Sequence, residues 1–447
     1  MPECCRINMP TLPVRHGTQS PTPSACPRGA SCCFLKVQMP PILIFFVIVA
    51  CAIVTPSAAF AQDEILEPLQ AWLESPDRPP LDEQRFAAMH LHSGEASDVK
   101  QMLLEHRRER LLDERATEWE EKSITLGEHE MKFDFRVFGD PGENGRSLFI
   151  SMHGGGGAPA HVNEQQWKNQ LGLYEPDEGV YLAPRAPTNN WNLWHEPHID
   201  KFFARLIEDA VLFEGVDPNR VYLMGYSAGG DGVYQLAPRM ADSWAAAAMM
   251  AGHPNDASPL GLRNIGFTLH MGGNDGAYDR NEVAAQWKQK LAQLQAADPE
   301  GYQHEVIIHE GKGHWMDRED AVAVPWMANF VRDPLPRRIV WRQSSVTHRQ
   351  FYWLAVSKDD AVAGAEVVVS RDGQEFAIER AENINRLTLR FNDDMVNLDR
   401  PIVVTYEGEQ LFNGPLPRSI TTMWRTLEER GDASYMFPAE LVVLLDD

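Results

Sequence analysis

The chain has 447 residues, of which 43% are hydrophobic and 23% are charged. This composition is typical of a globular protein, and the length exceeds that of one average domain. The formal net charge is −23 at pH 7. Because such a field repels nucleic acid and anionic membrane surfaces, it excludes nucleic acid as a partner and favours neutral or cationic partners.

Residues 39–61 have the pattern of a secretory signal peptide. An apolar run from Ile42 to Val54 follows Lys36, and the small-residue motif Ala59-Phe60-Ala61 ends the segment. The run is too short for a comfortable membrane span. We therefore expect export to the periplasm or the exterior, a mature chain that begins at Gln62, and no stable membrane insertion after cleavage.

Residues 1–38 are rich in Pro, Ser and Cys, and we expect a non-native or disordered extension there, with Met39 as the true start. An alternative to signal cleavage is the lipobox-like segment Ile48-Val49-Ala50-Cys51, which would place a lipid on Cys51. All six cysteines lie at or before this position. A chain that begins after the signal peptide therefore has no thiol, which excludes disulfides, a cysteine nucleophile and a cysteine-ligated metal.

Two regions of different pattern follow the signal peptide. Residues 62–122 are highly charged with apolar positions at roughly helical spacing, so we expect helices packed on the main domain. From 123 to 333, short apolar runs alternate with helical patterns, which predicts a mostly parallel sheet covered by helices on both faces, with sites at the carboxyl ends of the strands. The expected strands are 131–139, 147–153, 179–184, 220–226, 245–252, 266–273 and 305–311, and the expected helices are 202–215 and 281–297.

Residues 334–447 are expected to form a smaller, β-rich accessory domain. Pro334 and Pro336 mark its beginning, and Asp372-Gly373 between two alternating runs predicts a hairpin. No catalytic motif falls in this region, so we expect it to support the main domain or to bind substrate. The expected strands are 337–343, 350–357, 365–380, 386–392 and 402–409, followed by a helix at 416–430.

The segment Gly225-Tyr226-Ser227-Ala228-Gly229 has the G-x-S-x-G pattern of a nucleophile elbow between a strand and a helix. Its glycines are required because a Cβ would clash in so tight a turn. The Ser227 hydroxyl needs a base that is oriented by an acid, and the chain order of this fold selects Asp275 and His314, each directly after an expected strand. Asp279 is the rival acid, and we expect its side chain to cap the helix that follows.

His153 is followed by four glycines, Gly154 to Gly157, directly after an expected strand. Glycines let backbone N–H groups approach a substrate carbonyl closely, so the loop predicts an oxyanion hole. We expect its donors to be the N–H groups of Gly154, Gly155 and Ala228, the residue after the nucleophile.

Four segments together resemble the α/β-hydrolase superfamily: HGGGG (153–157), DPNRVYLMGYSAGG (217–230), HMGGNDGAYD (270–279) and GKGHW (311–315). They are similar to secreted serine esterases of the polyhydroxybutyrate-depolymerase and feruloyl-esterase type, and they also resemble prolyl-oligopeptidase-like peptidases. The resemblance covers residues 123–333 and implies an α/β-hydrolase core, Ser227 as nucleophile, Asp275 as acid, His314 as base and no cofactor. The absence of disulfides from the mature chain departs from depolymerases of this type.

Substrate contacts are expected from five residues: His153, Tyr226, Trp191, Trp194 and His198. The tryptophans would form flat walls that suit sugars or aromatic acyl groups. A metal site at His195, His198 and Asp200 is the alternative, but no third histidine stands at ligand spacing and we expect no metal. His270 and His309 are expected to pack within strands, and Asp231 to begin the helix after the nucleophile.

The sequence therefore predicts an exported serine hydrolase that cleaves carboxylic esters, small or polymeric, through an acyl-enzyme intermediate. Two alternatives stay open: a peptidase that uses the same machinery on amides, and an inactive binding protein on a hydrolase scaffold. The presence of all three triad residues favours an enzyme.

Overall fold

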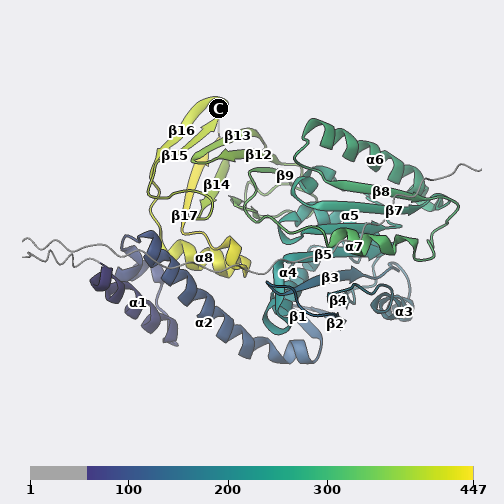
Figure 1. The fold of residues 1–447 in the computed structure, drawn as a ribbon, viewed down its shortest axis with the longest axis horizontal. Helices are drawn as coiled ribbons and strands as arrows, with labels where there is room; N and C mark the ends of the chain where they lie inside the picture. Colours follow the sequence, from purple (N-terminus) through teal and green to yellow (C-terminus); the bar gives the residue numbers. More distant parts are fainter. Residues whose placement is uncertain (1–57, 446–447) are drawn as a thin grey trace, which may run out of the picture. The chain divides into compact units, whose positions relative to one another are not determined.

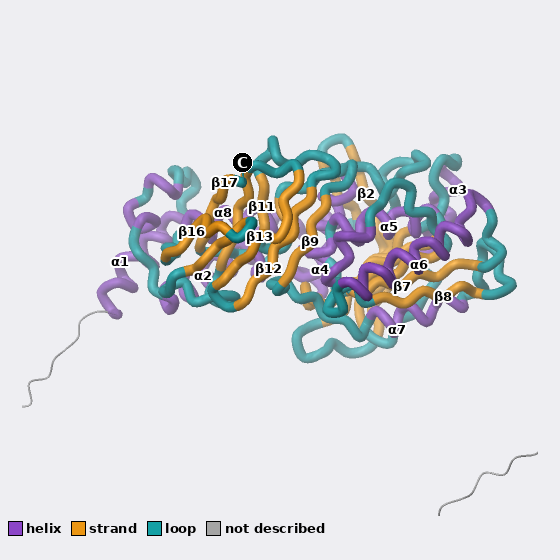
Figure 2. The backbone as a smooth tube through the Cα atoms, turned by 90° about the horizontal axis from the view of Figure 1, so that it is seen from above, coloured by secondary structure: helices purple, strands orange, loops and turns teal. Residues whose placement is uncertain are grey.

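The computed structural model describes residues 58–445, all of which belong to one compact unit (Figures 1 and 2). The expected extension 1–38 and nearly all of the expected signal peptide lie outside the described residues. The expected cleavage site after Ala61 falls within the first helix, α1 (Ala58–Glu74). Of the described helices, none is long and apolar enough to cross a membrane.

The centre of the unit is an eight-stranded sheet with the order β1-β2-β4-β3-β5-β6-β7-β8. β2 pairs antiparallel with both β1 and β4, and every other neighbouring pair is parallel. The prediction of a mostly parallel sheet is therefore confirmed. The strands are β1 (Ser123–Leu126), β2 (His129–Phe138), β3 (Arg146–Met152), β4 (Gly179–Pro184), β5 (Val216–Tyr226), β6 (Ala246–Met250), β7 (Gly266–Gly272) and β8 (His304–His309).

Helices bury both faces of this sheet, and the alternation of side chains along β5 shows how. Val221 and Leu223 belong to the core beneath one set of helices, whereas Tyr222 and Met224 belong to a second core on the opposite face. Because both faces are covered, inner strands such as β4 (GVYLAP) and β6 (AAAMM) are continuous apolar runs in the sequence. The first face packs against α4 (His198–Glu214), α5 (Ala228–Arg239) and α6 (Arg280–Ala297), and the second against α3 (Ala160–Leu171) and α7 (Ala323–Met327).

The N-terminal helices form a separate apolar cluster with a helix from the far end of the chain. Leu69 of α1 and Leu103 of α2 (Ser93–Glu120) are buried together with Ile420 and Leu427 of α8 (Ile420–Arg430). Figure 1 shows α2 and α8 side by side. The second half of α2 also contacts α4, where the Trp119 indole N–H donates to a Glu214 carboxylate at 3.0 Å.

Two further sheets, mainly antiparallel, make up the C-terminal region, with the orders β10-β11-β14-β17 and β16-β15-β13-β12-β9. The expected hairpin at Asp372-Gly373 is present between β12 and β13, and Gly373 adopts φ 56°, which a glycine accepts at no steric cost. The strands are β9 (Arg338–Arg342), β10 (Gln350–Phe351), β11 (Leu354–Val356), β12 (Glu366–Asp372), β13 (Glu375–Glu382), β14 (Arg386–Phe391), β15 (Ile402–Tyr406), β16 (Glu409–Gly414) and β17 (Ala439–Leu444).

Asp242, which follows α5, joins the C-terminal region to the central sheet. Its buried carboxylate accepts hydrogen bonds from Arg430 Nη2 at 2.6 Å and from the Tyr352 N–H at 3.2 Å. Its backbone carbonyl accepts from Arg332 Nη1 and from the Tyr435 hydroxyl, both at 2.8 Å. That the β-rich region is an accessory domain stays a prediction, and Asp242 is one of the residues that bind it to the sheet domain.

Asp242→Asn should lower the free energy of unfolding by about 3 kcal/mol, because it leaves the Arg430 guanidinium without its buried counter-charge. Urea unfolding followed by tryptophan fluorescence measures the change. The matched control is Asp140→Asn in an exposed loop, which should stay within about 0.5 kcal/mol of the parent. Equal stability of the two variants would contradict a structural role for Asp242.

Candidate active site

Ser227 occupies a strained turn between β5 and α5. Its backbone has φ 57° and ψ −118°, a combination that L-residues rarely adopt. The flanking glycines make the turn possible: a Cβ on Gly225 would lie 2.3 Å from the Gly229 carbonyl oxygen, and one on Gly229 would lie 2.1 Å from that of Met152. The Ser227 N–H donates to the Met250 carbonyl at 2.9 Å, which fixes the turn to β6.

Ser227, His314 and Asp275 form one hydrogen-bonded chain. His314 Nδ1 lies 2.7 Å from Asp275 Oδ2, and His314 Nε2 lies 2.9 Å from Ser227 Oγ. Since a carboxylate can only accept, Nδ1 carries the ring proton and Nε2 is left to accept the proton of the serine hydroxyl. The Asp275 side chain is 2% exposed and that of His314 is 44% exposed, so the acid is shielded while the base faces solvent.

The loop after β7 places Asp275, and not Asp279, at the histidine. The Asp275 N–H donates to the Gly272 carbonyl, and its own carbonyl accepts from Asn281, whose side chain donates to the Gly273 carbonyl. Asp279 stands at the N-cap position of α6, but its side chain makes no capping hydrogen bond. The expectation of a side-chain cap is wrong, because the residue has left-handed backbone angles of φ 55° and ψ 29° instead of the extended ones of a capping residue.

The glycine loop after β3 offers backbone donors next to the serine. Two of its N–H groups are already used within the fold: that of Gly156 donates to Asn163 Oδ1 and that of Gly157 to the Asn189 carbonyl, both at 3.0 Å. Gly154 packs so closely on Ser227 that an added Cβ would lie 3.2 Å from the serine Cβ. Ala228 is the first residue of α5, where backbone N–H groups have no partner within the helix. Gly154, Gly155 and Ala228 therefore stay the expected oxyanion donors.

The structure combines four features: the strand order of the central sheet, a serine elbow after β5, an acid after β7 and a histidine after β8. The fold is that of an α/β-hydrolase. The α/β-hydrolase core carries all three residues of the chain from Asp275 to Ser227 at the carboxyl ends of its strands, and the C-terminal sheets are additional to it.

Solved structures with partial likeness to the chain include several esterases. A thermostable esterase is 18% identical with a TM-score of 0.39, over 47% of this chain and 62% of its own, so the match spans less than two thirds of that protein. A ferulic acid esterase is 13% identical with a TM-score of 0.32, over 46% of this chain and 95% of its own. The Bacillus cereus carboxylesterase is 16% identical with a TM-score of 0.33, over 44% and 94%. No protein-family model and no curated protein matches the chain.

His153 and Trp194 are fully buried in the α/β-hydrolase core, and the expectation that they contact substrate is wrong. The His153 ring donates from Nδ1 to the Gly154 carbonyl at 2.6 Å and accepts the Ala186 N–H at Nε2, at 3.2 Å. Burial lowers the pKa of His153 to about 3, so the ring is neutral. The Trp194 indole N–H donates to the His153 carbonyl at 2.9 Å. Both side chains hold the glycine loop.

Tyr226 and His198 make contacts within the fold, and their contact with substrate stays a prediction. The buried Tyr226 hydroxyl donates to the His314 carbonyl at 2.6 Å and accepts the Met316 N–H at 3.1 Å, so it fixes the histidine loop. The His198 ring stacks on His129 at 3.9 Å between ring centres and lines a cavity with residues of α2 and α4. The structure therefore does not bring either side chain into the chain of Ser227, His314 and Asp275.

Trp191 is 63% exposed and lies beside the glycine loop, with its Cβ 3.6 Å from the Cβ position of Gly157. Its contact with substrate stays a prediction. Tyr278, after the acid, and Trp315, after the histidine, are also exposed, and these three are the exposed large aromatic side chains of the described residues. Neither Tyr278 nor Trp315 is among the expected substrate contacts, although their places in the sequence, beside Asp275 and His314, are a signal.

Asn163 holds the glycine loop in place, and no pattern in the sequence points to it. It is fully buried in α3, where its amide donates to the Ala158 carbonyl at 3.1 Å and to Asn189 Oδ1 at 2.9 Å, while its oxygen accepts the Gly156 N–H. Three hydrogen bonds thus tie the glycine loop and Asn189 to one side chain. It is a single asparagine in a polar segment without a recognisable motif, so the sequence offers no signal for its role.

The remaining polar residues singled out in the sequence are bound within the fold. Asp200 pairs with the Arg239 guanidinium through one oxygen and accepts a hydrogen bond from His348 Nε2 through the other, at 2.6 Å. Both oxygens of its carboxylate are therefore bound within the fold. Among residues 58–445, no group of three or more potential metal ligands occurs. His270 and His309 are buried in strands, as predicted. Nδ1 of His270 lies 3.2 Å from Nε2 of His309.

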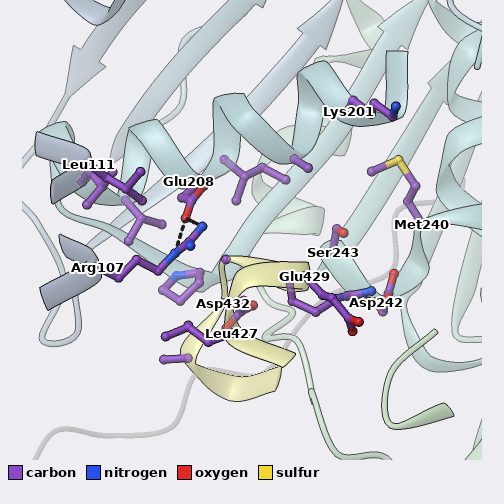
Figure 3. Close-up of a pocket in the computed structure, with 18 of the residues that line it drawn as sticks. Arg107, Leu111, Lys201, Glu208, Met240, Asp242, Ser243, Leu427, Glu429 and Asp432 are labelled. Atoms are coloured by element: carbon purple, nitrogen blue, oxygen red, sulfur yellow. Dashed lines mark hydrogen bonds and ion pairs between the residues drawn. The ribbon is translucent and has the colours of Figure 1, made fainter. Parts of the chain in front are cut away.

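A cavity of about 420 Å³, lined by both aliphatic and charged side chains, lies between α2, α4 and the loop after α8 (Figure 3). Leu111, Met240 and Leu427 are among its walls, and Arg107 pairs with Glu208 at its edge. None of Ser227, Asp275 and His314 lines it. The cavity therefore lies where the N-terminal helices, the sheet domain and the C-terminal region meet, and it is separate from the triad.

Gly229→Ala should lower the free energy of unfolding by about 2–3 kcal/mol, because the new methyl group overlaps the Met152 carbonyl. The matched control is Gly276→Ala on the acid loop: its φ of −82° suits alanine, and an added Cβ meets nothing within 4 Å. This control should be neutral or gain about 0.5 kcal/mol. Thermal and urea unfolding measure both, and equal losses would contradict the close packing at the elbow.

Proposed function

We propose that the chain is a serine hydrolase that cleaves carboxylic esters. The observation that carries the proposal is the hydrogen-bonded chain from Asp275 through His314 to Ser227, with the serine on a strained elbow. An alcohol at neutral pH is a weak nucleophile, and this arrangement supplies the base that accepts its proton and the acid that orients the base.

In the proposed reaction, Ser227 Oγ attacks the ester carbonyl carbon while His314 Nε2 accepts the hydroxyl proton. The carbonyl oxygen, now negative, receives hydrogen bonds from the N–H groups of Ala228 and of the loop at Gly154 and Gly155. His314 then protonates the leaving alcohol oxygen, and the C–O bond to the alcohol breaks. A water molecule, deprotonated by His314, then attacks the acyl carbon. The bond between this carbon and Ser227 Oγ breaks, His314 returns the proton to Oγ, and the carboxylic acid is released.

The half-exposed His314 side chain and the exposed Trp191, Tyr278 and Trp315 side chains favour an open site that admits small or polymeric esters. The leaving group in such a site departs directly into solvent. The same machinery could act on amides, and a panel of acyl esters and aminoacyl amides measures the preference. Ester turnover that exceeds amide turnover supports the proposal, and the reverse result would assign a peptidase.

Ser227→Ala should reduce ester hydrolysis at least about 1,000-fold and abolish labelling by a fluorophosphonate probe, because only the nucleophile is lost. Circular dichroism and thermal unfolding of the variant should match those of the parent. Near-normal turnover in a pure preparation of the folded variant would overturn the mechanism.

Asp275→Asn should lower kcat about 10,000-fold, because an amide that donates to His314 favours the wrong ring tautomer. The matched control is Asp279→Asn, four residues further on, which should change kcat less than about threefold. Asparagine tolerates the left-handed backbone of that position, and the side chain makes no capping bond. Loss of activity in the control with retention in Asp275→Asn would move the acid to Asp279.

We further propose that the protein is exported and that its mature chain begins at Gln62. The support is the pattern of residues 39–61, with Ala59-Phe60-Ala61 before the expected cleavage site. Intact-mass measurement and N-terminal sequencing of the exported protein test it. A terminus at a lipid-modified Cys51 would contradict the proposal and make the protein membrane-anchored.

A further inference from the structure

The triad acid has a second ionic partner besides the histidine. Arg280, the first residue of α6, places Nη1 3.7 Å from Asp275 Oδ1, the oxygen that does not face His314. The Arg280 side chain is only 12% exposed, and its guanidinium lies over the exposed Tyr278 ring at 4.9 Å. Its Nε is buried without a hydrogen-bond partner, and Nη1 also donates to the Ala277 carbonyl at 3.4 Å. Asp275 is the carboxylate with which this largely shielded cation pairs.

A second carboxylate lies in the same electrostatic neighbourhood. Asp231, one turn after the nucleophile in α5, accepts the His253 N–H at 2.6 Å. Burial raises the pKa of Asp231, and the positive charges of Arg280, His253 and His314 act in the opposite direction. Arg280 is therefore a permanent cation that acts on Asp231 and also pairs with Asp275.

We propose that Arg280 is a positioning residue of the triad, which holds Asp275 with one oxygen toward His314 and offsets the negative charges of Asp275 and Asp231 beside the ring. The inference rests on the proposed function for its meaning in catalysis. The geometry that carries it is the ion pair on the far oxygen of Asp275 and the shielding of Arg280 from solvent.

The direction of the effect follows from the charges around His314. The His314 ring contacts Ser227 at Nε2 and Asp275 at Nδ1, and its charge acts on Asp231 of α5. Arg280 of α6 and His253 act on these carboxylates, and the Tyr226 hydroxyl donates to the His314 backbone carbonyl. On its own loop, Lys312 is paired with Asp317 and Glu319. Loss of the Arg280 charge leaves two carboxylates that favour the protonated ring, so a base that must be neutral becomes available only at higher pH.

Arg280→Gln should move the acid limb of the kcat/KM pH profile upward by about 0.5–1 pH unit, the effect of one unit charge lost near a half-exposed ring. Arg280→Lys keeps the charge and should leave the limb within about 0.2 unit of the parent. Asp231→Asn removes a negative charge and should move the limb in the opposite direction. The matched control is Lys288→Gln, which removes an exposed cation two turns further along α6 and should not move the limb.

The same shifts are measured without turnover by NMR titration of the His314 ring in a Ser227→Ala background. The His314 signals are identified by their absence in His314→Asn. This readout separates the two hypotheses: absent ester turnover in the parent enzyme contradicts the proposed function, whereas the titration midpoint tests Arg280 alone.

A folded Arg280→Gln variant whose His314 midpoint matches that of Lys288→Gln would overturn the inference. If Arg280→Gln does not fold, Asp231→Asn decides: a downward shift of the midpoint supports the charge balance, and an unchanged midpoint overturns it. An upward shift in Arg280→Gln that Arg280→Lys does not share supports the inference.

Discussion

Ser227 has backbone angles of φ 57° and ψ −118°, a conformation that costs an L-residue on the order of 1–3 kcal/mol. The close packing around the turn stabilises this strained backbone. Gly229 lies so close to the end of β3, and Gly225 so close to Gly229, that no side chain fits at either position. This close approach fixes the distance between β3, β5 and α5. Because the glycine loop begins where β3 ends, the same contact also sets the serine against the backbone donors of the proposed oxyanion hole.

The other loops at this edge of the sheet are fixed by hydrogen bonds from buried or half-buried side chains. Asn163 holds the glycine loop, Tyr226 holds the histidine loop at the His314 carbonyl, and Asn281 holds the acid loop at Gly273. These partners act on backbone atoms, so they position the loops without entering the reaction. A site held in this way needs little reorganisation when charge develops on a substrate oxygen, which is where electrostatic stabilisation is most effective.

Charge balance is a second theme of the fold. The chain is strongly acidic, and several buried carboxylates are matched by an arginine: Asp242 by Arg430, Asp200 by Arg239, and Asp275 by Arg280. Breaking such a pair leaves an uncompensated buried charge, which costs more than the pair itself contributes. The first two pairs join segments far apart in sequence, whereas the third lies within five residues and acts on the triad.

The sequence by itself determined the order of seven of the eight central strands, all except β1, and the chain positions of Ser227, Asp275 and His314. Strands buried on both faces are apolar throughout, and the elbow and glycine loop require glycines whatever surrounds them. It did not reveal α3, whose buried residues are the polar Asn163 and Gln170, nor the largely exposed edge strand β16, since neither shows a hydrophobic period. The roles of His153, Trp194 and Tyr226 were decided only by tertiary structure. A side chain that follows a strand points either to the solvent-facing edge or beneath the loops, and only the packing of the neighbouring loops selects between the two.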